Sequence, residues 1–112
     1  MRDVHLSRKL VLEAPARVPD GAGGFAESWT VLGTVWADIR ARTGRKRDGG
    51  EVSLSSTAYR IVLRGAPQGA PSRPVAGMRF REGTRLFAID AVSERDPQGR
   101  YLTCFATEEA AR

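Results

Sequence analysis

The sequence predicts an all-β fold, a small β-barrel of about six or seven short strands, and three observations support this. Short segments of alternating apolar and polar residues recur along the 112-residue chain, as expected for strands with one buried face. Clusters of glycine, proline and aspartate separate these segments at steady spacing. No segment has the apolar spacing of a helix. Closure into a barrel, SH3-like or similar, would also hide the strand edges of so short a chain.

The first predicted strand covers residues 5–13, where Leu10 and Leu12 share one face and Pro15 follows closely. Residues 18–24 form a turn cluster whose glycines are expected to take positive φ angles. In the segment 34–42, Val35 and Ile39 face one way and Trp36 the other. The remaining predicted strands are 25–32, ended by Gly33, then 58–64, 78–80, 85–92 and 101–106.

Two long loops interrupt these strands in what we expect to be a single domain over residues 1–112. Residues 43–57 are polar, glycine-bearing and basic at their start, and they predict a flexible loop. Residues 65–77 contain three prolines and predict a second loop. Residues 81–84 predict a tight hairpin turn, and residues 93–99 predict another turn.

The charge balance predicts an acidic partner. Lysine and arginine total 18 against 13 acidic residues, a net charge of +5, and Lys9 and Lys46 are the only lysines. Arginine forms forked hydrogen bonds to carboxylates and phosphates, so nucleic acid or an acidic protein surface would fit. A coding bias that favours arginine, alanine and glycine explains the excess equally well. The longest apolar run is too short for a signal core or a membrane span, so we expect synthesis in the cytoplasm and no membrane partner.

The sequence predicts no catalytic, cofactor-binding or metal site. The one histidine, His5, lies near a terminus, where a surface position is a better explanation than catalysis. The one cysteine, Cys104, lies in an apolar strand and is expected to be a buried structural thiol and not a nucleophile. The carboxylates form no pair at metal-ligand spacing.

Two features are candidates for contact with other molecules. The first is a cationic run that crosses from a strand into the first long loop, formed by Arg40, Arg42, Arg45, Lys46 and Arg47. These side chains could contact DNA phosphates, or they could pair with carboxylates of a protein neighbour. The second is Trp36, which is either an outward-facing protein contact or a residue covered by a loop.

The order of several motifs over nearly the whole chain resembles the head-closure, or head–tail connector "stopper", family of tailed bacteriophages, prophages and gene transfer agents. The motifs are a leucine-rich first strand, Asp20-Gly-Ala-Gly-Gly24, Glu27-Ser-Trp29, Val35-Trp-Ala-Asp-Ile39, Tyr59-Arg-Ile-Val-Leu-Arg64, Met78-Arg-Phe80, Arg85-Leu-Phe-Ala-Ile89 and Leu102-Thr-Cys104.

This resemblance implies a β-barrel that forms a ring in the neck of a phage or phage-like particle, assembled in the host bacterial cytoplasm. The ring, sixfold or twelvefold, would lie between the portal and adaptor proteins on one side and the tail-terminator or tail-tube proteins on the other. It would close the DNA channel without reading sequence and dock the tail. The alternatives are a tail terminator, which should contain a helix, and a nucleic-acid-binding barrel, which should expose aromatic residues beside its cations.

Overall fold

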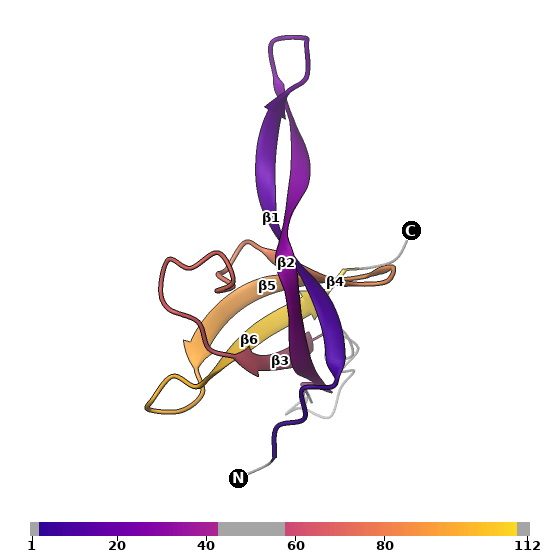
Figure 1. The fold of residues 1–112 in the computed structure, drawn as a ribbon. Helices are drawn as coiled ribbons and strands as arrows, with labels where there is room; N and C mark the ends of the chain where they lie inside the picture. The colour runs from indigo at the N-terminus through magenta and orange to yellow at the C-terminus, as the bar shows by residue number, and fades with distance from the viewer. Residues whose placement is uncertain (1–2, 43–57, 110–112) are drawn as a thin grey trace, which may run out of the picture.

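The computed structural model describes residues 3–42 and 58–109, which form six antiparallel strands (Figure 1). The strands are β1 (Arg8–Pro19), β2 (Phe25–Ala41), β3 (Ala58–Arg64), β4 (Arg79–Glu82), β5 (Arg85–Glu94) and β6 (Tyr101–Glu108). They close into a barrel in the order β1-β2-β3-β6-β5-β4, which confirms the predicted all-β barrel. The predicted loop at 43–57 lies outside the described residues. Within the described ranges, no helix is long and apolar enough to cross a membrane.

The barrel interior is filled by the apolar faces of all six strands. Leu10 and Leu12 on β1 are 0% and 1% exposed, which confirms the inward face predicted for that strand. The other core residues are Ala37, Ile61, Leu63, Phe80, Phe87, Ile89, Cys104 and Ala106. Tyr59 packs edge-on against Phe87 with ring centroids 5.3 Å apart. Because side chains alternate along a strand, the residues between these core positions lie on the outer face of the barrel.

Strands β1 and β2 continue beyond the barrel as a two-stranded arm, which rises above the other strands in Figure 1. We define the arm as residues 14–31. β1 pairs with β4 only at residues 11–13, and β2 pairs with β3 only from Ala37 onward. No strand of the described ranges therefore neighbours either outer edge of the arm. The predicted end of the first strand at residue 13 is therefore wrong. Pro15 and Pro19 are compatible with β1 because an unpaired outer edge needs no N–H donor.

Gly33 does not separate two strands, and this corrects a second prediction. Leu12 pairs with Gly33 and Glu13 pairs with Val31, so Leu32 is an extra residue that forms a bulge. The bulge increases the local twist at the point where the arm leaves the barrel. Glycine is suited to this position because its φ angle is 155°.

The turns contain glycines with positive φ angles, as predicted, but several strands are longer than predicted and the turns are correspondingly shorter. The arm turn comprises residues 20–24, where Gly21 and Gly23 have φ angles of 81° and 88°. The hairpin between β4 and β5 turns through two residues, and Gly83 supplies the positive φ that the first position of such a turn requires. β5 extends to Glu94 and β6 to Glu108, beyond the predicted ends, because the two strands pair from Phe87 and Glu108 to Glu94 and Leu102, with a register shift at Asp90.

Candidate interaction surfaces

The base of the arm is held by Glu13, a carboxylate that is only 4% exposed. It accepts hydrogen bonds from Nε of Arg79 at 2.7 Å and from Nε of Arg81 at 2.9 Å. Burial alone would raise the pKa of Glu13, but these two hydrogen bonds outweigh burial and hold its pKa below 4.5. The Arg79 guanidinium also lies 4.0 Å from the centroid of the Trp29 ring. Strand β4 is thus bound to β1 immediately below the arm and to β2 within the arm.

The arm exposes apolar side chains to solvent both at its base and near its tip. Val18, Phe25 and Val31 are 42%, 60% and 56% exposed, and they account for three of the five large exposed apolar residues in the described chain. The Arg17 guanidinium lies 4.6 Å from the Phe25 ring. An isolated two-stranded ribbon is marginally stable in water, so the arm depends on its base and on what it contacts.

The tip of the arm is held in one shape by Asp20. Its Oδ1 accepts hydrogen bonds from the backbone N–H groups of Ala22 at 2.8 Å and Gly24 at 3.0 Å. These bonds hold the pKa of Asp20 below its usual value, so the tip carries a negative charge at neutral pH. The arm as a whole contains Arg17, Asp20 and Glu27, a net charge of −1 in a chain of net charge +5.

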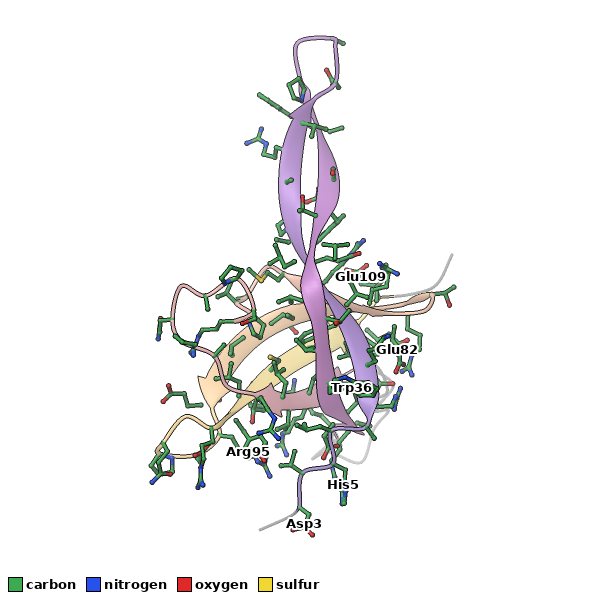
Figure 2. All side chains as sticks on the ribbon, viewed as in Figure 1. Asp3, His5, Trp36, Glu82, Arg95 and Glu109 are labelled. Carbon is green, nitrogen blue, oxygen red and sulfur yellow. The ribbon has the colours of Figure 1, made fainter. Side chains whose placement is uncertain are left out.

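Trp36 lies on the barrel part of β2, well away from the arm tip, and is 55% exposed (Figure 2). Trp36 faces outward, as the alternation predicted, and of the two alternatives left open the exposed one is observed. Its role as a protein contact stays a prediction. Trp36 lines a shallow cleft of about 270 Å³ together with Leu6, Leu63 and Arg64. Lys9 is its direct neighbour on β1, so two cations border this apolar cleft.

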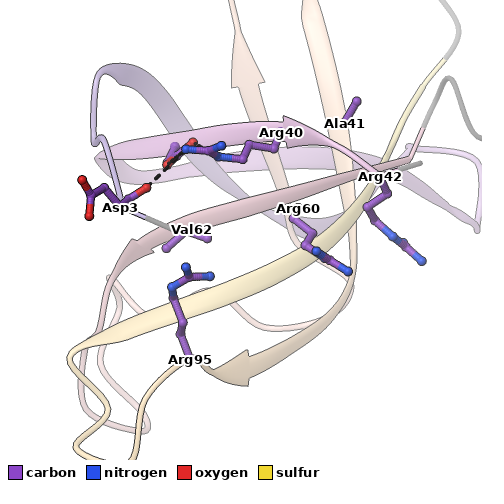
Figure 3. A pocket seen from close by; sticks show the side chains of 8 residues that line it. Asp3, Arg40, Ala41, Arg42, Arg60, Val62 and Arg95 are labelled. Atoms are coloured by element: carbon purple, nitrogen blue, oxygen red, sulfur yellow. Dashed lines mark hydrogen bonds and ion pairs between the residues drawn. The ribbon is translucent and has the colours of Figure 1, made fainter. Parts of the chain in front are cut away.

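A basic face covers the outer side of β2, β3 and β6. We define the basic face as the pocket-lining arginines Arg40, Arg42, Arg60 and Arg95 with Phe105. The pocket measures about 540 Å³ and is also lined by Asp3 and Asp38 (Figure 3). Because Arg40 pairs with Arg60, and Arg60 with Phe105, the register alone places these side chains in one row on the outer face.

Within this face, Arg40 is held in place by acceptors of its own chain. Its Nε lies 3.0 Å from Oδ1 of Asp38, and its Nη2 donates to the backbone carbonyl of Asp3. Burial would raise the pKa of Asp38, but the hydrogen bonds from Arg40 and the His5 backbone N–H outweigh it and lower the pKa. Arg40 therefore has a structural partner already.

Arg42 and Arg60 are arranged differently, since both lie over the same aromatic ring. Their guanidinium carbons are 5.4 Å and 6.0 Å from the centroid of Phe105. Phe105 lies on the outer face and is half-buried, because the alternation along β6 turns Cys104 and Ala106 inward. Sequence reasoning missed Arg60 and Arg95 as members of the basic face. Arg45, Lys46 and Arg47 lie outside the described residues.

Other arginines of the barrel are used in ion pairs that join neighbouring strands. Arg8 makes a forked pair with Glu82, both hydrogen bonds being 2.7 Å long. Arg85 binds Glu108 at 2.8 Å and 3.1 Å and donates to the Tyr59 hydroxyl. Part of the arginine content is therefore explained by the fold and not by a partner.

Cys104 and His5, the two residues considered as catalytic candidates, make structural contacts. Cys104 is fully buried, and burial raises the pKa of its thiol to about 12. His5 is an exposed residue ahead of β1 that uses its backbone N–H to bind Asp38. Among the described residues, no group of three or more histidine, cysteine, aspartate or glutamate side chains is placed to hold a metal ion.

Comparisons with known proteins identify relatives over the full length of the chain. Residues 1–109 match the protein family described as "Phage head completion protein". A chain from the structure "Virion of native gene transfer agent (GTA) particle" is 48% identical, with a TM-score of 0.76 and 100% of each chain covered. A Shigella flexneri 2a protein solved in solution has the same fold, with 19% identity, a TM-score of 0.71 and full coverage of both chains. No curated protein matches the sequence.

Proposed function

Because the chain belongs to the phage head completion protein family, we propose that it is a neck protein of a phage or phage-like particle that forms a stopper ring. Family membership confirms the expectation of a structural protein and not an enzyme. In this role the ring lies between the portal and adaptor proteins and the tail-terminator or tail-tube proteins, closes the DNA channel and docks the tail. The observation that carries the proposal is the match, over the whole of both chains at 48% identity, to a chain of a gene transfer agent virion.

The distribution of surfaces supports a protein with several neighbours. The closed barrel leaves few free strand edges outside the arm, so contacts must be made by side chains and projections. The arm, the Trp36 cleft and the basic face lie on different parts of β2, separated along one 17-residue strand. A ring subunit needs separate surfaces for its two neighbours in the ring and for the components above and below.

We assign two roles in this ring to the cationic run identified in the sequence. Arg40, held by Asp38, is suited to an interface with fixed geometry, and Arg42 lies beside it. The loop cations Arg45, Lys46 and Arg47 are proposed to face the DNA in the channel. Repetition of these charges in every subunit would create a belt of positive potential that holds phosphates without reading bases.

The experiment uses cells that produce the particle and from which the coding sequence has been removed. We expect DNA-filled heads that lack tails and lose their DNA, with restoration by the wild-type chain. Imaging of the restored particles should place the chain in the neck as a ring. Normal tail joining and DNA retention without the chain would overturn the proposal.

One observation favours a second candidate function, a nucleic-acid-binding barrel. Phe105 lies on the outer face beside Arg42 and Arg60, the combination of an aromatic ring with cations that a single-stranded nucleic acid would use. Tight, salt-sensitive binding of oligonucleotides by the purified chain, lost in F105A, would favour this candidate over the neck ring. Weak binding without dependence on Phe105 would exclude it.

A further inference from the structure

The arm is a large projecting feature, and none of the described strands pairs with either of its outer edges. Its base is fixed by Glu13, Arg79 and Trp29, and its tip is shaped by Asp20, so the exposed side chains are presented in a defined direction. Phe25 at 60% exposure lies next to the tip. Phe25 shares its face of the arm with Val31 and with its cross-strand partner Pro19, and an exposed apolar face on a small domain marks a contact with another molecule.

The Trp36 cleft is complementary to the arm in shape and in charge. It is concave and apolar, whereas the arm is convex and apolar. The cleft is bordered by two positive charges, Lys9 and Arg64, whereas the arm has a net charge of −1. Such complementarity in shape and charge fixes the orientation of a contact as well as its partner.

The two surfaces cannot meet within one molecule. Phe25 and Trp36 lie on the same strand, eleven residues apart, which corresponds to about 35 Å along an extended chain. Figure 2 shows Trp36 on the barrel, while the arm points away from it. The contact therefore requires a second copy of the chain.

We infer that the arm of one copy docks its Phe25 side against the Trp36 cleft of the next copy, with Glu27 facing Lys9 and Arg64. The contact is head-to-tail, since each copy offers its arm to one neighbour and its cleft to the other. Repeated contacts of this kind close into a ring when the rotation between copies permits it. The inference rests on the proposed function only for the place of this ring in the particle.

The test uses disulfide trapping between purified chains, which needs no particle. Pro19→Cys places a thiol on the same face of the arm as its cross-strand partner Phe25, and Ser72→Cys places one in the cleft; both positions are exposed. Cys104 is fully buried and should not react. Mixing the two variants under mild oxidation over a concentration series should give a disulfide-linked dimer. A chain carrying both substitutions should give a ladder of linked copies.

Matched variants identify the contact. We expect Phe25→Ser to reduce the yield of linked dimer at least tenfold, whereas Val75→Ser, at an apolar residue 46% exposed elsewhere, should leave it unchanged. Glu27→Lys should reduce the yield, and Arg64→Glu on the partner copy should restore it. Gln98→Cys, on the exposed 95–100 turn, replaces Ser72→Cys as the control for random collisions.

Three results would overturn the inference. They are a yield no higher than that of the collision control, a Pro19→Cys variant that links to itself as efficiently as to Ser72→Cys, and a yield unaffected by Phe25→Ser. The second result would show that arms pair with arms. Failure of the proposed function can be told apart from failure of this inference. In that case the chain would be absent from the particle neck, but the disulfide-linked dimer would still form in solution.

Discussion

The Arg79 guanidinium lies over the Trp29 ring at 4.0 Å from its centroid, and this contact crosses from barrel strand β4 to the arm. Arg79 simultaneously donates to Glu13 on β1. One arginine thus contacts β1 immediately below the arm and β2 within it, at the point where the bulge turns both strands away from the barrel. The direction of the arm depends on this side chain more than on the ribbon itself, because a ribbon without a covered face has little rigidity of its own.

Arg79→Ala should lower the free energy of unfolding by about 2 kcal/mol, since it removes a charged hydrogen bond from the largely buried Glu13 and the stacking on Trp29. Arg100→Ala is the matched control. Its side chain is 73% exposed and pairs with Asp96 at the surface, so the loss should stay below about 0.5 kcal/mol. Denaturant unfolding of both variants measures the difference. Equal losses would show that the Arg79 contacts have no special role.

The stability contributed by Glu13 should depend on pH. Its pKa is lowered in the folded chain relative to 4.5, so its contribution is present above about pH 4.5 and is lost as the pH falls through the lower folded value. Glu13→Gln should therefore be less stable than the wild type at pH 7, and the gap should narrow toward pH 3. Unfolding curves across this range test the prediction. A gap of constant size would mean that protonation of Glu13 is not involved.

Cys104 should be inert in the folded protein. Its thiol is fully buried and has a pKa of about 12, so little thiolate is present and reagents reach it only when the barrel opens. We expect an aromatic disulfide reagent to react at least about 100-fold more slowly in buffer than in urea. Rapid modification under native conditions, without loss of the β-sheet circular dichroism signal, would contradict the assignment of a structural thiol.

Deletion of residues 44–53 should leave the described barrel folded but block maturation of the particle. The barrel closes without this segment, because the Arg42 N–H donates to the Ala58 carbonyl at 2.8 Å and the strands on either side pair from Ala41 and Tyr59 onward. Cooperative thermal unfolding near the wild-type midpoint is the expected result in solution. Loss of cooperativity in the deleted chain would show that the segment belongs to the core.

Replacement of Arg45, Lys46 and Arg47 with serine separates the two roles of the cationic run. If these cations face DNA, filled heads should assemble normally and then leak DNA, increasingly so at higher salt. Loss of ring assembly would instead show a protein interface at these positions. Glu109→Ser, an exposed acidic residue near the end of β6, is the control and should change neither readout.

The sequence pattern predicted the barrel because its strands have one buried face, and the alternation of Leu10 and Leu12 or of Ile61 and Leu63 survives in the structure. It failed at the arm for a physical reason. Proline and glycine usually end strands, so Pro15 and Gly33 predict strand ends. The alternation of side chains does not show that Pro15 lies on an unpaired edge, or that a bulge beside Gly33 takes up one residue.

The candidate surfaces were predicted only in part. The outward direction of Trp36 follows from the alternation of side chains along its own strand, so it could be predicted from the sequence. The grouping of Arg40 with Arg60 and Phe105 depends on register across three strands, and β3 and β6 are separated by nearly forty residues. Similarly, Arg79 and Trp29 are fifty residues apart, and only the closure of the barrel by β4 brings them together.

The continuity of β2 through arm and barrel limits how relatives of this protein can vary in length. Inserting one residue into each strand of the arm would rotate Phe25 to the opposite side of the ribbon, because side chains alternate along a strand. Two residues in each strand would restore its direction and move it outward by about 7 Å. Natural variation of this projection should therefore occur in paired steps of two, accompanied by a matching shift of the surface it meets.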